Sequence, residues 1–342
     1  MNMAQAAIAA AENLPLPDAA LRFGVARLVG RTSRLLANAR NSDREFAQGM
    51  AGWPIATNVD QANEQHYELP PAFFELALGP QRKYSCCLYR GPESTLAEAE
   101  LAALEESCEH ANLTDGQSIL ELGCGWGSLS LFMAERYPRS SIVSVSNSVS
   151  QRMFIESEIV RRGFENLSVV TADMNDFDAQ GKFDRIVSVE MFEHMSNWDA
   201  LLRRARDWIA PDGRVFIHVF SHCDSAYRFD RADKTDWIAQ HFFTGGLMPS
   251  HTLMRQFEES FVVERDWRWN GIHYQRTALD WLGNFDRNSA AIRTIFQRTY
   301  GEDAALWMRR WRLFFLATAG LFGHEAGNEW SVSHYLLRPS GS

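Results

Sequence analysis

The sequence predicts an α/β fold in which helices flank a doubly wound, mainly parallel sheet. Two observations favour this fold: short β-branched runs alternate with longer amphipathic runs, and a glycine-rich turn follows the first of these runs. The expected strands cover 118–122, 141–145, 167–171, 183–189 and 214–220, and the expected helices cover 129–136, 150–162 and 198–209. A turn at 211–213 should precede the last strand, and two more strand-like runs follow at 261–267 and 331–337.

The chain divides into an N-terminal helical cap, residues 1–95, and a sheet domain, residues 96–342, with a helical insertion at about 270–325. In the cap, apolar residues recur at helical spacing over 21–40, and the other faces of that helix carry five arginines and no acid. We expect this helix to pack on its own domain with its arginines in water. Peripheral membrane contact through 21–40 and a homodimer stay open.

Composition excludes several classes of protein. The chain has 34 basic and 43 acidic side chains, a net charge of −9, which disfavours a general binder of nucleic acid. Its longest apolar run, 313–323, is about half of the ~20 residues that a bilayer crossing requires, and no basic region precedes the apolar N-terminus. We therefore expect a cytoplasmic protein. The five cysteines show no CxxC spacing, so neither disulfides nor structural zinc are expected.

The glycine turn lies in the segment ILELGCGWGSLS, with glycines at 123, 125 and 127. Glycines at this point permit a tight turn and let a ligand approach the backbone near a helix N-terminus. The GxGxG spacing is that of S-adenosylmethionine methyltransferases, whereas the dinucleotide pattern GxGxxG would need glycine at Ser128.

The segment VEMFEHM places Glu190, Glu193 and His194 at the carboxyl end of the fourth strand, where α/β sheets hold their ligands. Two carboxylates and an imidazole are costly to place near apolar neighbours unless they have a chemical role. An alternative is a helix N-terminus whose acids complement the dipole. A metal site of the HxxEH kind is disfavoured because Glu190 stands where the first histidine would be, and no metal is expected.

Taken together, the motifs ILELGCGWG, VEMFEHM, KYSCCLY, HFFTGGLMPS and GIHYQRT resemble the cyclopropane fatty acid synthase superfamily of class I methyltransferases. The chain looks most like the coclaurine N-methyltransferase group of that superfamily, over residues 14–337. The resemblance implies a class I, Rossmann-like methyltransferase fold and S-adenosylmethionine as the cofactor. It also implies a small, alkaloid-like aryl or arylalkyl amine as the methyl acceptor.

The resemblance also implies which residues bind the cofactor. Tyr84 and Ser85 would close over it, and Gly123 and Gly125 would lie against its methionine part. Ser146 and Asn147 stand where many methyltransferases have a ribose-binding acid, so Gln151 is the ribose candidate. Asp173 and Met174 fit an adenine-edge acceptor and an apolar lid, and Val189 completes the set.

Within the amine branch, the resemblance gives Glu193 and His194 the task of handling the amine proton, with Glu190 holding the ammonium ion. An ammonium nitrogen must lose its proton before it can attack a methyl group, which requires such a base. The alternative is a cyclopropane-fatty-acyl-phospholipid synthase-like enzyme that modifies unsaturated acyl chains with bicarbonate as the base. Its matching positions are Cys124, Glu193, His218 and Tyr274, and all four residue types are present. We favour the amine because WMRRWRLFFLATAGLFG and FSHCDSAY resemble the amine branch more closely.

A nucleic-acid methyltransferase is the remaining rival. The chain is acidic and has no Asn-Pro-Pro-Tyr after the fourth strand, the signature of adenine N-methylation. We expect no nucleic-acid partner.

Overall fold

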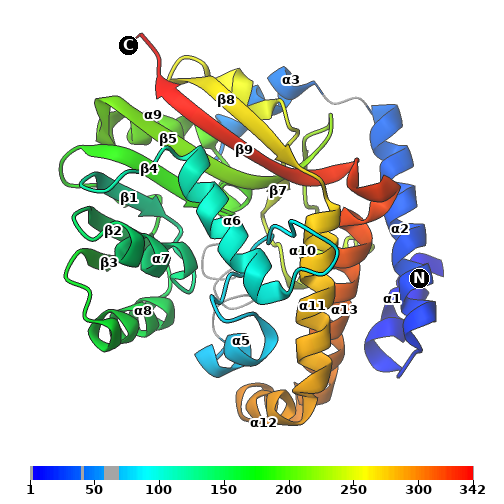
Figure 1. Cartoon of the computed structure of the whole chain (residues 1–342). Helices are drawn as coiled ribbons and strands as arrows, with labels where there is room; N and C mark the ends of the chain where they lie inside the picture. The colour runs from blue at the N-terminus through cyan, green and yellow to red at the C-terminus, as the bar shows by residue number, and fades with distance from the viewer. Residues whose placement is uncertain (1–2, 40–41, 58–68, 342) are drawn as a thin grey trace.

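The computed structural model describes residues 3–39, 42–57 and 69–341. One large sheet lies beside a group of long helices (Figure 1). The strands are β1 (Ser118–Leu122), β2 (Ser141–Ser146), β3 (Leu167–Thr171), β4 (Phe183–Val189), β5 (Ile209–His222), β6 (Tyr227–Arg228), β7 (Leu247–Met248), β8 (Phe261–Trp269) and β9 (Trp330–Pro339). The helices are α1 (Met3–Asn13), α2 (Asp18–Ala39), α3 (Asp43–Met50), α5 (Pro71–Ala77), α6 (Leu96–His110), α7 (Ser128–Arg136), α8 (Val149–Arg162), α9 (Trp198–Trp208), α10 (Trp237–His241), α11 (Ile272–Arg287), α12 (Ser289–Tyr300) and α13 (Ala304–Phe322). Short 3₁₀ turns cover Phe192–His194, Leu253–Phe257, Gly301–Asp303 and His324–Gly327.

The large sheet has the strand order β3-β2-β1-β4-β5-β9-β8. Its first five strands pair in parallel, which confirms the doubly wound sheet. The order reverses between β1 and β4, so the carboxyl ends of these strands flank the crevice in which such sheets bind ligands. β9 inserts between β5 and β8 and runs antiparallel to both. The expected strands at 261–267 and 331–337 are thus confirmed as an antiparallel edge.

The largest difference from the expected strand boundaries is at the start of β5. β5 begins at Ile209, where it pairs with Phe183, and not at Arg214. The register between β4 and β5 shifts after this first pair, and the expected turn at 211–213 lies in the interruption. The extra residues bulge out of the ladder while the chain on either side stays paired, so the turn is a bulge within a strand.

The N-terminal helices pack against the C-terminal helices. α2 covers the expected helix 21–40 up to residue 39, and residue 40 lies outside the described residues. α2 buries Val25 and Val29 and runs beside α13 (Figure 1). A Cβ at Gly320 of α13 would collide with the Val25 side chain, so glycine lets the two helices approach closely. Arg312 then ties three helices together, because its guanidinium donates to the carboxylates of Asp18 (2.6 and 2.9 Å) and Asp286 (2.9 Å).

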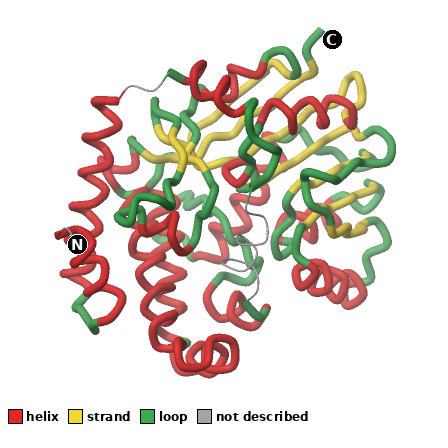
Figure 2. The backbone as a smooth tube through the Cα atoms, turned by 180° about the vertical axis from the view of Figure 1, so that it is seen from behind, coloured by secondary structure: helices red, strands yellow, loops and turns green. Residues whose placement is uncertain are grey.

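The core is continuous from the sheet into this helical part. Figure 2, which shows the molecule from behind, has the long helices gathered at one end, away from the strands of the sheet. Their core is aromatic, with Phe73, Trp281 and Trp311 almost fully buried. Rings of this size bury large apolar areas and stabilise the helical part without a sheet of its own. Within the described ranges, no helix combines the length and the apolarity needed to cross a bilayer.

The start of α11 offers a test of this packing. A Cβ at Gly271 would lie closer to the carbonyl oxygens of Trp330 and Phe322 than real Cβ contacts allow. Both obstacles are backbone, so Gly271→Ala should lower the free energy of unfolding by about 2–3 kcal/mol. Gly283→Ala, inside α11, is the control, because a Cβ there would meet only the Arg287 side chain, at 4.0 Å. Alanine is more favourable than glycine inside a helix by about 1 kcal/mol, so this variant should not lose stability. Chemical denaturation of both variants would measure this, and equal stability would contradict the packing described.

Candidate active site

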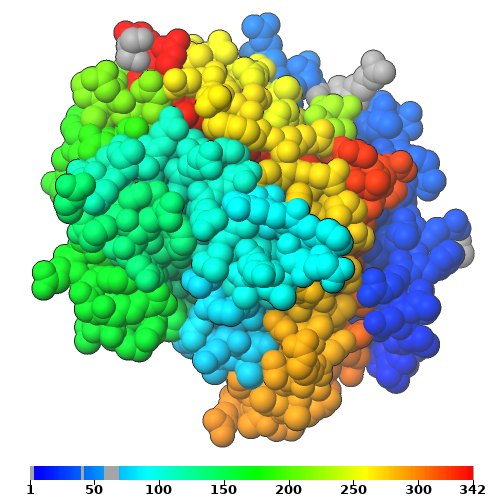
Figure 3. Space-filling model, viewed as in Figure 1, coloured from blue at the N-terminus to red at the C-terminus, as the bar shows by residue number. Residues whose placement is uncertain are grey.

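The ten residues expected to bind the cofactor line one cavity at the carboxyl ends of the parallel strands. They are Tyr84, Ser85, Gly123, Gly125, Ser146, Asn147, Gln151, Asp173, Met174 and Val189. Five segments of the chain therefore meet. Tyr84 and Ser85 come from the segment between α5 and α6, which lies over the centre of the face shown in Figure 3, in cyan.

The glycine turn shapes one wall of this cavity. Gly125 has φ +53°, and a Cβ there would meet no atom within 4 Å, so the backbone faces open space. Gly123 also has a positive φ, but a Cβ there would press on the Met191 side chain (2.7 Å). Gly125 thus leaves room for a ligand, while Gly123 lets the turn pack against the segment that carries Glu190.

A polar pair lies at the end of β2. The Ser146 hydroxyl and the side-chain carbonyl of Gln151 share a hydrogen bond of 2.7 Å, and the Ser148 hydroxyl caps α8 by accepting from the Gln151 N–H. Gln151 is buried, yet its Nε2 has no partner within the described residues. A buried donor without a partner is costly, so this amide is oriented to bind an acceptor in the cavity. A ribose hydroxyl supplies such an acceptor.

The loop after β3 holds Asp173 rigidly. The backbone and side-chain N–H groups of Asn175 both donate to Asp173 Oδ1, at 2.8 and 3.0 Å. Arg204 of α9 fixes the same loop by donating to the carbonyl oxygens of Met174, Asn175 and Phe177. The Asp173 carboxylate and the buried Met174 side chain therefore keep fixed positions in the wall of the cavity.

Glu190 ends β4 in an unusual backbone conformation, with φ +47°. A left-handed conformation costs a residue with a side chain about 1–3 kcal/mol and is found mainly at functional sites. Three groups surround its carboxylate: the Cys86 N–H donates to Oε1 (3.1 Å), the Tyr274 hydroxyl donates to Oε2 (2.7 Å), and His218 Nε2 lies 3.3 Å from Oε1. Burial raises the pKa of Glu190, whereas these donors favour its charged form.

Lys83, which the sequence did not single out, supports this arrangement. It is buried, and its Nζ donates to the Ser85 hydroxyl (2.5 Å) and to the Cys86 carbonyl (2.6 Å). The lysine thereby holds Ser85 in the cavity wall and Cys86 against Glu190. A signal was present in the sequence, because Lys83 is one of only three lysines in the chain and lies directly beside the motif residue Tyr84.

Glu193 and His194 lie in the 3₁₀ turn that follows β4. Burial and the neighbouring charge of Glu190 raise the pKa of Glu193 well above its usual value, and its Oε2 has no hydrogen-bond partner in the described structure. Burial lowers the pKa of His194 to about 4, so its ring is neutral at pH 7. The ring stacks on Phe243 at 5.0 Å between centroids.

A second, larger cavity adjoins the first. It has a volume of about 1280 Å³ and is lined mainly by apolar side chains of α1, α2, α10, α11 and α13. Glu190, Glu193, His194 and Tyr84 line it as well, and three of these, all except Glu193, line the cofactor cavity too. The two cavities therefore meet at the acidic cluster.

Three of the four residues of the bicarbonate alternative come together in the structure. His218 and Tyr274 meet at the Glu190 carboxylate, and Glu193 lies nearby. Cys124 lines the cofactor cavity, as Glu190 does, and its backbone N–H donates to the Val145 carbonyl. An ion can contact residues that do not contact one another, and the four-residue site stays a prediction.

One group of potential metal ligands lies elsewhere, at His222, Cys223 and Asp224. His222 Nδ1 accepts hydrogen bonds from the backbone N–H groups of Asp224 (3.3 Å) and Ser225 (3.0 Å). Its lone pair is thus engaged, and Nε2 lies 3.2 Å from the Glu329 carboxylate. These contacts give the histidine a structural role at the end of β5.

Known proteins are similar over most of this chain. A family model described as mycolic acid cyclopropane synthetase matches residues 56–330. An (S)-coclaurine N-methyltransferase from Thalictrum flavum subsp. glaucum is 38% identical over 289 residues, which are 83% of this chain and 80% of that protein. A pavine N-methyltransferase from the same plant is 32% identical over 297 residues, or 86% of this chain and 83% of that protein.

A crystal structure of coclaurine N-methyltransferase bound to N-methylheliamine and SAH has a TM-score of 0.92 with this structure at 33% identity. The match covers 97% of this chain and 98% of that chain. This similarity and the strand order confirm the expected class I methyltransferase fold. The chain belongs to the mycolic acid cyclopropane synthetase family and is a methyltransferase of the group that includes coclaurine N-methyltransferase.

Proposed function

We propose that this protein is an N-methyltransferase that transfers a methyl group from S-adenosylmethionine to a small arylalkyl, alkaloid-like amine. The observation that carries this proposal is the junction of the two cavities, where Glu190 and His194 line both the cofactor cavity and a large apolar cavity, and Glu193 lines the apolar one. An apolar cavity binds the aromatic part of such an amine, and a carboxylate at its end binds the ammonium group.

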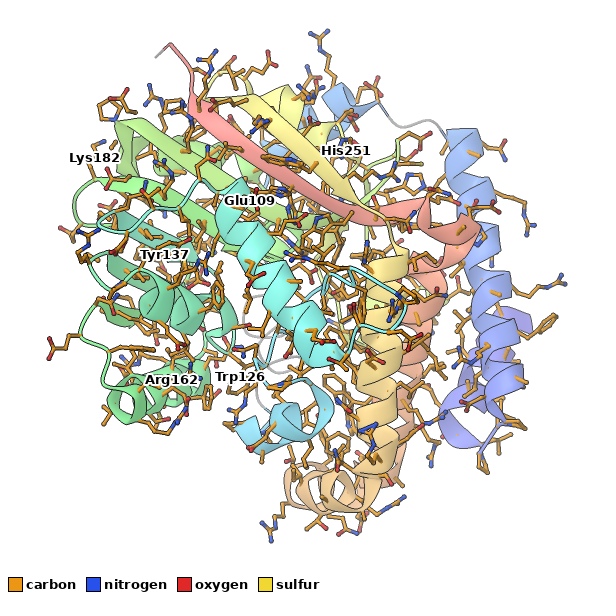
Figure 4. All side chains as sticks on the ribbon, viewed as in Figure 1. Glu109, Trp126, Tyr137, Arg162, Lys182 and His251 are labelled. Carbon is orange, nitrogen blue, oxygen red and sulfur yellow. The ribbon has the colours of Figure 1, made fainter. Side chains whose placement is uncertain are left out.

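The residues of the first cavity fit S-adenosylmethionine, whose sulfonium supplies an electrophilic methyl group when bound. The Gln151 amide is free to bind a ribose hydroxyl, the open space at Gly125 admits the methionine part, and Asp173 is held as an acceptor for the adenine amino group. Trp126, labelled in Figure 4 between α5 and α8, packs on Phe74 at 4.8 Å and closes the wall of this cavity.

The protein must generate the free amine, because an arylalkyl amine is protonated at neutral pH. Glu190 accepts from the Cys86 N–H and the Tyr274 hydroxyl, so it is the carboxylate better prepared to be ionised and to attract the cation. Burial and the Glu190 charge raise the pKa of Glu193 well above its usual value, which favours its protonated form. A bound ammonium ion lowers the pKa of both carboxyls, since a nearby cation favours their charged forms. Glu193 and the neutral His194 ring can then accept the proton from nitrogen.

In the lipid alternative, bicarbonate would bind between the residues that match the cyclopropane synthase positions. Two of those residues, His218 and Tyr274, already bind the carboxylate of Glu190. A second anion in the same place would lie beside a buried carboxylate and would lose these partners. The geometry therefore favours a site in which the protein supplies its own carboxylate and the substrate supplies the cation.

The direct test of the function is methyl transfer from labelled S-adenosylmethionine to two panels, arylalkyl amines and unsaturated phospholipids, with and without added bicarbonate. We expect label in amines only and no stimulation by bicarbonate. Label in phospholipids that depends on bicarbonate would establish the lipid alternative and refute this proposal.

The cofactor site can be tested by filling the space at Gly125. Gly125→Val puts a side chain into the cavity, so S-adenosylmethionine binding measured by calorimetry should be lost. Gly163→Val is the matched control, because Gly163 also has a positive φ (+70°) and open space around it, but it ends α8 outside the cavity. Both variants carry similar backbone strain. Unchanged affinity in a folded Gly125→Val protein would show that the cofactor binds elsewhere.

The proton-handling role of Glu193 and His194 predicts a pH-dependent defect. Glu193→Gln and His194→Ala should each lower kcat by about 10²–10⁴-fold while leaving cofactor affinity nearly unchanged. The double variant should be little slower than the worse single one, because the two residues share one task. Turnover should recover partly as the pH rises toward 9, because solution then supplies free amine. Near-wild-type turnover of both single variants from pH 6 to 9 on a confirmed amine would contradict the role.

A further inference from the structure

Three histidines form a hydrogen-bonded row that begins at Glu190. His218 Nε2 lies 3.3 Å from Glu190 Oε1, and His218 Nδ1 lies 2.7 Å from His334 Nε2. His334 Nδ1 is in turn 2.8 Å from His110 Nδ1. Both ring nitrogens of His218, and both of His334, therefore lie within hydrogen-bond distance of a neighbour in this row. We call His218, His334 and His110 the histidine row.

The fold places these rings in line. His218 of β5 and His334 of β9 are directly paired in the antiparallel ladder, and Trp267 of β8 is paired with His334. These three side chains therefore lie on one face of the sheet. His110, in the last turn of α6, stacks on Trp267 with 3.8 Å between ring centroids. In Figure 4 the label of Glu109 marks this end of α6, where it lies against β9.

The row leads from the site toward the surface. His218 and His334 are fully buried, whereas the His110 side chain is 11% exposed and lies 3.9 Å from the half-exposed Glu106 carboxylate. Trp269 covers the inner part, because its ring lies 5.4 Å from that of His218 and 4.3 Å from that of His334. The Trp269 indole N–H donates to Glu106 (3.2 Å), the carboxylate beside His110.

The surrounding charges keep the rings neutral. Burial lowers the pKa of His218 and His334 well below the usual value, and the Lys83 cation acts in the same direction on both. Burial lowers the pKa of His110 to about 4, with Glu109 opposing the shift and Arg265 adding to it. At the inner end, Glu190 also faces Tyr274, Cys86, His194 and Glu193. A neutral imidazole donates at one nitrogen and accepts at the other, as a chain of proton transfers requires.

We propose that the histidine row is the path by which the proton taken from the amine substrate leaves the buried site for solvent. The inference rests on the proposed function, because methylation of an ammonium substrate releases one proton per turnover: the ammonium ion gives up a proton, its nitrogen forms the bond to carbon, and the carbon–sulfur bond of the cofactor breaks.

The transfers along the row balance. The proton that Glu193 or His194 takes from the amine first moves to the neighbouring Glu190 carboxylate. It passes from Glu190 Oε1 to His218 Nε2 while the Nδ1 proton of His218 passes to His334 Nε2. The Nδ1 proton of His334 passes to His110 Nδ1, and His110 Nε2 releases its proton to water. One proton has left Glu190, and every ring is again neutral with its proton on the opposite nitrogen. The starting tautomers return when the rings exchange their protons with water during local opening of the structure, and the microsecond-to-second range of such opening matches turnover of about 1–10³ per second. His334 and His110 are thus positioning residues that act through His218 and Glu190.

The coupling of the row can be tested without a substrate, by NMR of the full-length protein labelled with ¹⁵N in its histidines. His110→Ala should change the ¹⁵N shifts of the His218 ring, two hydrogen bonds away, because it changes the tautomer that His334 adopts. The His251 ring is the internal control, since it bonds to Ser333 on the opposite face of β9 and lies outside the row. Unchanged His218 signals would overturn the path, whatever the protein methylates.

The path itself is tested with His334→Gln. An amide can donate to His218 and accept from His110, so it keeps the ring positions, but it cannot pass a proton on. On an amine that the wild type methylates, we expect kcat at pH 7 to fall about tenfold or more, with cofactor affinity and melting temperature unchanged and with recovery toward pH 9. Proton release, followed with an indicator dye in weak buffer, should lag behind methyl transfer.

Two further variants complete the design. His251→Gln should behave as wild type. His110→Ala should be slow and should recover with added imidazole, which a merely structural defect would not do. Wild-type kcat and prompt proton release in His334→Gln would refute the path while leaving the N-methyltransferase function intact. Failure of the wild type to methylate any amine would instead refute the proposed function, and the NMR test would still decide whether the row is coupled.

Discussion

The site depends on one buried carboxylate. Glu190 adopts a left-handed backbone conformation. Its carboxylate accepts hydrogen bonds from the Cys86 N–H and the Tyr274 hydroxyl, and the His218 ring lies 3.3 Å from it. These partners come from the segment before α6, from α11 and from β5, so the carboxylate joins the N-terminal segment, the helical addition and the sheet at one point. Burial raises its pKa, whereas the Lys83 charge and the hydrogen bonds from Tyr274 and Cys86 favour its charged form. The conformational cost at residue 190 is offset only when the whole chain is folded around it.

This constraint links the two halves of the reaction. The parallel sheet and its glycine turn build the cavity for the cofactor, whereas α2, α11 and α13 build the apolar cavity of about 1280 Å³ for the acceptor. A neutral cavity of this kind would bind many hydrophobic molecules. The negative charge at its inner end selects those with a cationic nitrogen, and excluding water there strengthens that attraction.

Local patterns in the sequence were enough to predict the parallel strands, the glycine turn and the gathering of the cofactor residues into one cavity. Contacts between distant segments were not predictable in the same way. The positive φ of Glu190, the supporting Lys83 and the pairing of His334 with His218 all depend on segments that meet only in the folded chain.

The most direct measurement is a crystal structure grown with S-adenosylhomocysteine, an arylalkyl amine and excess bicarbonate, because amine and bicarbonate then compete for the same corner of the site. The account predicts the amine nitrogen within about 3 Å of a carboxylate oxygen of Glu190 or Glu193, its aromatic part in the apolar cavity, and Tyr274 still donating to Glu190. Carbonate bound between His218 and Tyr274, with Glu190 displaced and no amine at the junction, would contradict it.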